Sequence, residues 1–258
     1  MPHSSAPVPG MLEKAPRRLV VATANPGKLR EFRSLLAGLP YELTSLAELG
    51  IESPAETGAS FMENATLKAR HAAASSGFAA VADDSGIEVD ALGGAPGIHS
   101  ARYAGADADD GANNAKLMSA LDGVPCERRR ARFRCALVLI EAADAPPLEA
   151  EAAWEGFILD APRGSGGFGY DPYFWLPELD QTAAELTPEE KNRLSHRGKA
   201  MRALRAALLA RLEAQARLEA QARLEAQAQL EAQAQLEAQA QLEAQAQLEA
   251  QAQPVLRA

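Results

Sequence analysis

The sequence predicts an α/β protein followed by a C-terminal repeat tail. Between residues 18 and 210, apolar residues recur alternately with a period of two and with a period of about three and a half, as expected where strands alternate with helices. An apolar fraction of 47% over 258 residues suffices for a substantial core. From residue 211 the pattern changes to a six-residue tandem repeat. We therefore expect a disordered Pro-rich leader over 1–17, a globular domain over 18–210 and a tail over 211–258.

Turn and capping residues divide the domain into its elements. Asn25-Pro26-Gly27 ends the first strand, and residues 60–63 match a capping box. The apolar run 79–82 ends at Asp83 and Asp84, which predicts the acidic pair at a strand's C-terminal end, where α/β proteins commonly hold ligands. In chain order we expect a strand over 18–23, a helix from 28 that stops at 38, a strand over 41–46, a helix from 60 toward 77, strands over 79–82, 130–140 and 151–159, and a helix over 188–209.

The composition limits the classes of partner. The apolar runs fall far short of the roughly 20 residues of a membrane helix, and the leader lacks an apolar stretch of signal-peptide length, so we expect a cytoplasmic protein that contacts no membrane. A formal charge of -9 disfavours polymeric nucleic acid, whereas a small phosphate ligand needs only a local cluster of cations. Cys126 and Cys135 lack C-x-x-C spacing and are expected to be reduced structural thiols.

The tail repeats a hexad seven times over residues 211–252, first as Arg-Leu-Glu-Ala-Gln-Ala and then as Gln-Leu-Glu-Ala-Gln-Ala. These residues favour a helix. At about 100° per residue, successive leucines lie about 120° apart and do not line one stripe. We therefore expect a solvated, fraying helix or a disordered extension in preference to a dedicated partner-binding arm.

Residues 164–171, Gly-Ser-Gly-Gly-Phe-Gly-Tyr-Asp, place four glycines around Phe168. They satisfy the G-x-G-x-x-G fingerprint, which in dinucleotide-binding proteins opens a helix. Pro172 argues against a helix, because the residue before a proline is biased away from helical dihedrals. We expect an extended loop whose backbone approaches a flat ligand closely and whose Phe168 stacks on a base.

Two further segments are suited to phosphate and metal chemistry. Residues 23–28 place backbone N–H groups, Asn25 and the charge of Lys28 at a helix start, where phosphate is stabilised, although they also suit an ordinary turn and lack the Walker spacing. Asp83 and Asp84 repel one another unless a cation or hydrogen bonds stabilise them, and Mg²⁺ shared with Glu56 would do so. The alternative is a turn in which Asp83 caps the backbone.

The segment Ser195-His196-Arg197 is basic and lies on or near the last helix. A hydrolase triad is excluded, because neighbours on a helix point about 100° apart and no nucleophile elbow occurs elsewhere. His196 and Arg197 are suited to donate hydrogen bonds to a base carbonyl, while Lys191 reaches phosphate. The alternative is a solvated, charged helix face.

Taken in order, these segments resemble the inosine triphosphate pyrophosphatase family, the Ham1-like nucleotide hydrolases that remove noncanonical purines. The resemblance covers roughly residues 18–209, and the leader and the hexads have no counterpart in it. At Ala24 the family usually carries Gly, and Ala would stiffen or narrow the triphosphate turn. The matching motifs are Thr23 to Lys28, Glu56-Thr57-Gly58, Glu63-Asn64-Ala65 with Lys68-Ala69, Ala82 to Gly86, Gly93 to Gly97 with Ser100 to Tyr103, Gly166 to Pro172, Glu189-Glu190-Lys191 and Ser195 to Gly198.

The resemblance implies a Mg²⁺-dependent hydrolase that cleaves ITP, dITP and XTP to the monophosphate and pyrophosphate. It also implies a homodimer of elongated α/β subunits, each with a central mixed sheet and a nucleotide cleft between two lobes. Asp84 would be the general base, and Glu56 and Asp84 would hold the magnesium. The substrate-binding residues would be Thr23, Ala24, Asn25, Pro26, Gly27 and Lys28 at the triphosphate, then Ser85, and Phe168, Gly169, Tyr170, Asp171, Lys191, His196 and Arg197 near the base and sugar.

Base selection has a simple chemical cause in this interpretation. Inosine and xanthine carry a carbonyl at position 6 where adenine carries an amino group, so N–H donors such as Arg197 would reject adenine. Two other function classes stay open. A housekeeping pyrophosphatase for modified pyrimidines would share the magnesium and triphosphate chemistry, and a noncatalytic nucleotide sensor or scaffold would use the hexad tail as its effector arm.

Overall fold

The structure is a computed structural model that describes residues 17–252, except Ala24, Pro40 and residues 143–144. The chain divides into two compact units, Met1–Ala207 and Leu208–Ala258. The predicted leader lies outside the described residues apart from Arg17, which is already the first residue of a strand.

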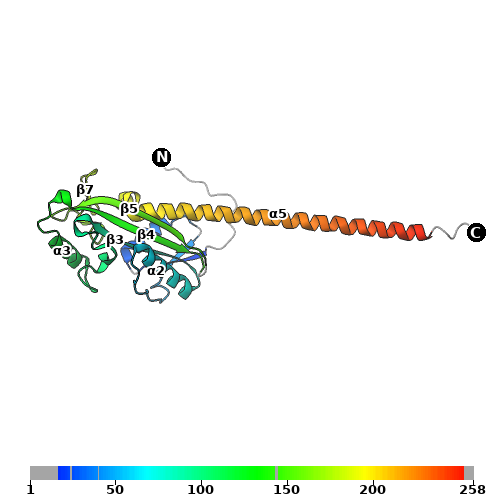
Figure 1. The fold of residues 1–258 in the computed structure, drawn as a ribbon, viewed down its shortest axis with the longest axis horizontal. Helices are drawn as coiled ribbons and strands as arrows, with labels where there is room; N and C mark the ends of the chain where they lie inside the picture. The colour runs from blue at the N-terminus through cyan, green and yellow to red at the C-terminus, as the bar shows by residue number, and fades with distance from the viewer. Residues whose placement is uncertain (1–16, 24, 40, 143–144, 253–258) are drawn as a thin grey trace, which may run out of the picture. The chain divides into compact units, whose positions relative to one another are not determined.

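A seven-stranded mixed sheet forms the centre of the first unit, in the order β2-β1-β3-β4-β5-β6-β7 (Figure 1). β2, β1 and β3 run parallel, and all pairings from β3 to β7 are antiparallel. The strands are β1 (Arg17–Val21), β2 (Tyr41–Ser45), β3 (Ala79–Val89), β4 (Arg130–Ile140), β5 (Leu148–Ile158), β6 (Phe174–Leu176) and β7 (Gln181–Thr182). The helices are α1 (Pro26–Leu35), α2 (Phe61–Ser76), α3 (Asp110–Ala120), α4 (Pro188–Leu194) and α5 (His196–Ala252), with short 3-10 turns η1 (Asp90–Leu92), η2 (Gly97–Arg102) and η3 (Cys126–Arg128). The predicted mixed α/β class is confirmed.

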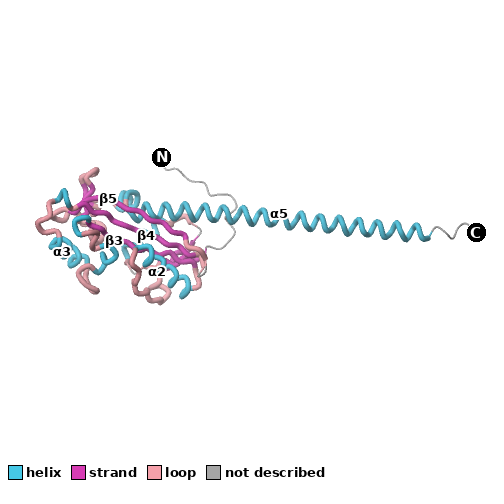
Figure 2. The backbone as a smooth tube through the Cα atoms, viewed as in Figure 1, coloured by secondary structure: helices cyan, strands magenta, loops and turns pink. Residues whose placement is uncertain are grey.

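Helices cover both faces of this sheet. α2 packs on β3 and β4, where its buried alanines allow a close approach to the apolar strand residues (Figures 1 and 2). The beginning of α5 lies on the opposite face beside α1, since Arg197 Nη1 donates to Glu31 of α1 and Arg205 Nη1 donates at 3.2 Å to the carbonyl of Ala37, just after that helix. A second core cluster gathers around Phe133, Trp154 and Phe174, near the opposite ends of the long strands. The sheet therefore carries two separate apolar cores.

β3 is longer than the sequence predicted. The expected strand over 79–82 ended at the acidic pair, whereas β3 continues to Val89 and places Asp83 and Asp84 in its middle. β1 pairs with β3 only as far as Val81, while β4 pairs with it from Ala80 to Val89. The long antiparallel partner carries the strand past two charged residues, and the turn in which Asp83 caps the backbone does not form. The acidic pair still lies just beyond the carboxyl end of β1.

The helix predicted over 188–209 is two helices. Ser195 is extended, with φ -68° and ψ 162°, and separates α4 from α5. This change of direction buries His196 and Arg197, which are 5% and 2% exposed. The alternative interpretation, a solvated helix face, is therefore wrong for these two residues.

Gly198 lets the two helices meet at this break. A Cβ at position 198 would overlap the carbonyl oxygen of Asn192. We expect Gly198→Ala to lower the free energy of unfolding by about 1–3 kcal/mol, as overpacking does, measured by urea denaturation. Gly111→Ala in α3 is the matched control, because a Cβ there meets only Asp109 Oδ1 at 3.3 Å, and it should leave stability unchanged or slightly raised. Equal effects of the two changes would contradict this account.

The tail is helical as far as Ala252. Its leucines from Leu218 to Leu248 are 68–69% exposed, and the Gln at the fifth position of each hexad, from Gln215 to Gln245, donates to the Glu four residues later, as from Gln215 to Glu219 at 3.1 Å. Such side-chain pairs stabilise a single solvated helix. Of the two expected forms, the helix is confirmed over the described residues. Among the described helices, none has the length and apolarity to cross a membrane.

Candidate functional site

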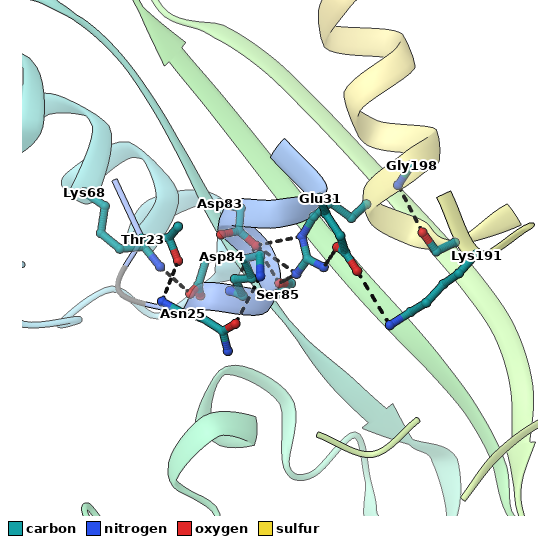
Figure 3. Close-up of polar contacts among 12 residues, drawn as sticks. Thr23, Asn25, Glu31, Lys68, Asp83, Asp84, Ser85, Lys191 and Gly198 are labelled. Carbon is teal, nitrogen blue, oxygen red and sulfur yellow. Dashed lines mark hydrogen bonds and ion pairs between the residues drawn. The ribbon is translucent and has the colours of Figure 1, made fainter. Parts of the chain in front are cut away.

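The candidate site lies where β1 ends and β3 continues. Successive residues of a strand point to opposite faces, so Asp83 points toward α1 and α5 while Asp84 points toward α2. The two carboxylates that the sequence predicted to repel one another are thus separated, and each has its own cations (Figure 3).

Asp83 is the centre of a buried cluster of charges. Its Oδ2 atom lies 3.0 Å from Lys28 Nζ and accepts bonds from Arg197 Nη2 at 3.0 Å and Ser85 Oγ at 2.8 Å. Glu31 of α1 completes the cluster through Arg197 Nη1 at 2.5 Å. Burial alone would raise the pKa of Asp83, but Lys28, Arg197 and Lys68 outweigh it and hold that pKa well below its usual range. The cluster joins β3, α1 and α5.

Asp84 faces a second cluster on α2. Lys68 Nζ donates to Asp84 Oδ1 at 2.8 Å and to Glu56 Oε1 at 2.9 Å, and Asn64 Nδ2 donates to Asp84 Oδ2 at 3.2 Å. Arg102 Nη1 also donates to Glu56, at 2.6 Å. Burial raises the pKa of Asp84 although Lys68 opposes the shift. Burial would also raise the pKa of Glu56, but Lys68 and Arg102 lower it to about 2.

The predicted glycine-rich loop is confirmed as a loop, and it closes against the start of α1. Gly27 allows this approach, since a Cβ there would lie 2.9 Å from Cδ1 of Phe168. Asp171 Oδ2 accepts from the backbone N–H of Phe168 at 2.9 Å and from Lys191 Nζ at 2.5 Å. The Lys191 ammonium lies 4.7 Å from the Phe168 ring centroid. Burial raises the pKa of Asp171 against the effect of Lys191.

His196 is held as a neutral, stacked ring. It lies parallel to Phe133, with centroids 4.8 Å apart and planes 10° from parallel. Burial lowers its pKa well below the ordinary value, and the charges of Arg197 and Lys191 add to the shift. Neutral imidazole is therefore the form in the folded protein at neutral pH.

This shift predicts an acid-sensitive stability. The unfolded chain binds a proton at His196 near pH 6.5 and the folded protein does not, so stability is complete above pH 6.5 and falls as the pH drops toward the depressed folded value. When the pH is lowered from 7.5 to 5.5, we expect the free energy of unfolding of the wild type to fall by about 1 kcal/mol more than that of His196→Phe, a variant that keeps a stacked ring. Urea denaturation at both pH values measures this. Parallel losses in the two proteins would show that His196 does not titrate on unfolding.

Two neighbouring pockets gather most of the predicted site residues. The first is lined by Asn25, Lys28, Ser85, Phe168, Gly169, Tyr170, Asp171, Lys191, His196 and Arg197, among others. The second is lined by Thr23, Asn25, Lys28, Glu56, Lys68 and Arg102, among others. Asn25, Lys28 and Ala101 belong to both. The arrangement suits a ligand with a flat apolar part in the first pocket and an anionic part in the second.

The remaining predicted residues have other places. Asn25 is the N-cap of α1 and accepts from the N–H of Lys28 at 3.0 Å, and Pro26 is the first residue of that helix. Gly27 has no Cβ, and this allows the ring of Phe168 to approach it closely. Ala24 lies outside the described residues. Asp84 contacts Lys68, which lines the second pocket.

Several residues that contact the predicted site residues had no predicted role of their own. Asn64 and Lys68 are four residues apart on α2, a spacing that puts both on one helix face beside Asp84. Glu31 is three residues after Lys28 on α1, and this spacing was the available signal. Arg197 also differs from the interpretation as a free base donor, because three of its nitrogens already donate to Asp83, Glu31 and Ser85.

The profile of the Ham1 family matches residues 19–207. The chain belongs to the Ham1 family. A dITP/XTP pyrophosphatase of Pectobacterium atrosepticum is 55% identical over 193 residues, covering 74% of this chain and 98% of that protein. The dITP/XTP pyrophosphatase of Methylococcus capsulatus is 56% identical over 195 residues, covering 75% and 97%. The structure of a HAM1 protein from Coxiella burnetii superposes with a TM-score of 0.70 at 44% identity, covering 75% of this chain and 98% of that one. The relatives thus align with the first unit of this Ham1 family member.

Proposed function

We propose that the protein hydrolyses ITP, dITP and XTP to the nucleoside monophosphate and pyrophosphate, and so removes noncanonical purines from the nucleotide pool. The observation that carries this proposal is the shared wall of the two pockets, which joins an aromatic pocket at Phe168 to a cationic pocket at Lys28 and Lys68. A nucleoside triphosphate has the same arrangement, with a flat base at one end and an anionic triphosphate at the other, joined by the sugar. The names of the relatives, dITP/XTP pyrophosphatase, support the same substrate class.

Magnesium belongs to this proposal as well. No three His, Cys, Asp or Glu side chains within the described part of the chain form a metal-binding group. Glu56 and Asp84 nevertheless fit Mg²⁺, because both carboxylates already lie within 2.9 Å of one cation, the Lys68 ammonium. Mg²⁺ commonly takes one or two protein carboxylates and completes its shell with substrate phosphates. When bound, the ion would neutralise charge that develops on the phosphates.

The residues of the chain would then position a water and move its proton. Cleavage to a monophosphate breaks the bond between the α-phosphorus and the oxygen that bridges to the β-phosphorus, and a water oxygen bonds to the α-phosphorus. Asp84 would accept the water's proton, since its carboxylate lies beside Lys68 at the wall of the second pocket. Lys28, Lys68 and Arg102 would orient the triphosphate.

Product analysis tests the proposal directly. The protein is incubated with Mg²⁺ and, separately, ITP, dITP, XTP, ATP, GTP and dUTP, and products are resolved by ion-exchange chromatography. Monophosphate plus pyrophosphate from the three noncanonical purines is the expected result. Preferential turnover of dUTP would favour a pyrimidine pyrophosphatase, and binding without turnover would favour a nucleotide sensor. We further propose a cytoplasmic homodimer, as the family resemblance implies, which light scattering of the purified protein and fractionation of cells would test.

A further inference from the structure

The glycine-rich loop of residues 164–171, called here the base-side loop, forms hydrogen bonds with α3 through Gly169. Its N–H donates to Asp110 Oδ2 at 2.6 Å, and its carbonyl accepts from Asn114 Nδ2 at 2.8 Å. Asp110 and Asn114 are one turn apart on α3, so a single helix face holds both backbone groups. Gly169 has a φ of +63°, a conformation that side-chain-bearing residues rarely adopt. The loop is therefore fixed immediately beside Phe168.

Asn114 contacts the loop through hydrogen bonds of its side-chain amide and not through apolar packing. It is 8% exposed, and its second Nδ2 bond goes to the carbonyl of Asp110 at 2.8 Å, so the amide donates to both carbonyls. Its Oδ1 atom is buried and, among the described residues, has no hydrogen-bond partner. An unpaired buried oxygen destabilises a protein, whereas a leucine here would leave none. Only an amide side chain at position 114 can donate hydrogen bonds to the carbonyls of both Asp110 and Gly169.

α3 is itself anchored to the wall of the base-side pocket. Asn113 Oδ1 accepts from the N–H of Ala104 at 2.8 Å, and Asn113 Nδ2 donates to the carbonyl of Ala101 at 3.2 Å. Tyr170, next to Gly169, donates its hydroxyl to the carbonyl of Ser100 at 2.8 Å. α3, η2 and the loop thus form one hydrogen-bonded unit at the wall of the first pocket, to which α3 contributes Asp110 and Asn113. A displacement of α3 would displace Phe168 with it.

We propose that Asp110 and Asn114 are positioning residues that place Phe168 and Gly169 against the base, and thereby set the affinity for the nucleoside part of the substrate. This inference rests on the proposed function. Asp110 lines the first pocket, but neither Asp110 nor Asn114 forms a hydrogen bond or ion pair with Lys28, Glu56 or Lys68 in the described part of the chain. Loss of either side chain should therefore weaken binding of the base and sugar and leave binding of the phosphates unchanged.

Two probes separate these parts of the substrate. dIMP reports on the base and sugar with one phosphate, and inorganic tripolyphosphate reports on the phosphates alone. In calorimetric titrations with Mg²⁺, Asn114→Leu and Asp110→Ala should each raise the Kd for dIMP about tenfold, as loss of one hydrogen bond that positions the loop does, and leave the Kd for tripolyphosphate within twofold. With dITP, KM should rise while kcat stays within threefold.

Two matched variants complete the design. Asp110→Asn keeps an oxygen that accepts from Gly169 and should recover most of the dIMP affinity, and Asp107→Ala changes an exposed carboxylate three residues away and should have no effect. Folding of each variant is checked by circular dichroism. Wild-type turnover of dITP with unchanged dIMP affinity in folded variants, or an equal loss of both probes, would overturn this inference alone. A wild-type protein that does not hydrolyse dITP would overturn the proposed function, and the inference with it.

Discussion

Asp84→Asn should lower kcat for dITP by about 10²- to 10⁴-fold, the usual effect of losing a positioned general base. The amide is isosteric with the carboxylate, and its oxygen still accepts a bond from Lys68, so the fold and nucleotide binding should survive. The amide cannot take up the proton of the attacking water. Steady-state kinetics at saturating dITP and Mg²⁺, with thermal unfolding measured in parallel, provides the test.

Asp122→Asn is the matched control, because Asp122 is exposed at the end of α3 and belongs to neither pocket. It should change neither kcat nor stability. A kcat of Asp84→Asn within tenfold of wild type would mean that another group takes the proton. Recovery of kcat at higher Mg²⁺ concentration would assign Asp84 to metal affinity alone.

Arg197→Met should destabilise the protein by about 3–5 kcal/mol, because it removes one partner from a buried network of charges. The change leaves Asp83, whose side chain is 0% exposed, with Lys28 as its close cation, and it deprives Glu31 of its short bond. Urea denaturation at pH 7.5 measures the free energy of unfolding. A large drop in stability distinguishes a residue that holds the site together from one that only reads the base.

Arg193→Met on α4 is the control for Arg197, since it removes the same charge from an exposed position four residues earlier. Its effect should lie within about 0.5 kcal/mol, as for most surface changes. If Arg197→Met unfolds like the control but raises KM for dITP, the guanidinium acts on the substrate and the buried network is not what maintains the fold.

The local chemistry of the sequence was enough to predict several elements. Ser60 caps α2 by accepting from the N–H of Glu63, as predicted, but the reciprocal half of the capping box does not form, because Glu63 accepts from the N–H of Ala59. The helix runs to Gly77 as expected. Pro172 correctly excluded a helix from the glycine-rich loop. Residue spacing alone could not predict the length of β3, because that length depends on β4, a partner more than forty residues later in the chain.

The predicted site residues were gathered by tertiary structure in ways that spacing did not reveal. Arg197 and Asp83 are 114 residues apart in the chain, and the break at Ser195 brings them into contact. Lys68, which received no role from sequence reasoning, lies between Glu56 and Asp84. The hydrogen bonds of Gly169 with Asp110 and Asn114 likewise join residues that are 59 and 55 positions apart in the chain.

The sequence by itself determined the α/β class, the family resemblance and the helix caps, because these depend on side chains and backbone groups within a few residues of one another, and it left the tail open between a helix and a disordered extension. Only the tertiary structure decided which charges are paired and buried. Pairing with β4 keeps Asp83 and Asp84 inside a strand, where successive side chains point to opposite faces, and the docking of α1, α2 and α5 brings cations to both. Burial in a region of low dielectric strengthens these pairings enough to lower the pKa values of Glu56 and Asp83, whereas at Asp84 the effect of burial itself prevails over Lys68 and raises the pKa.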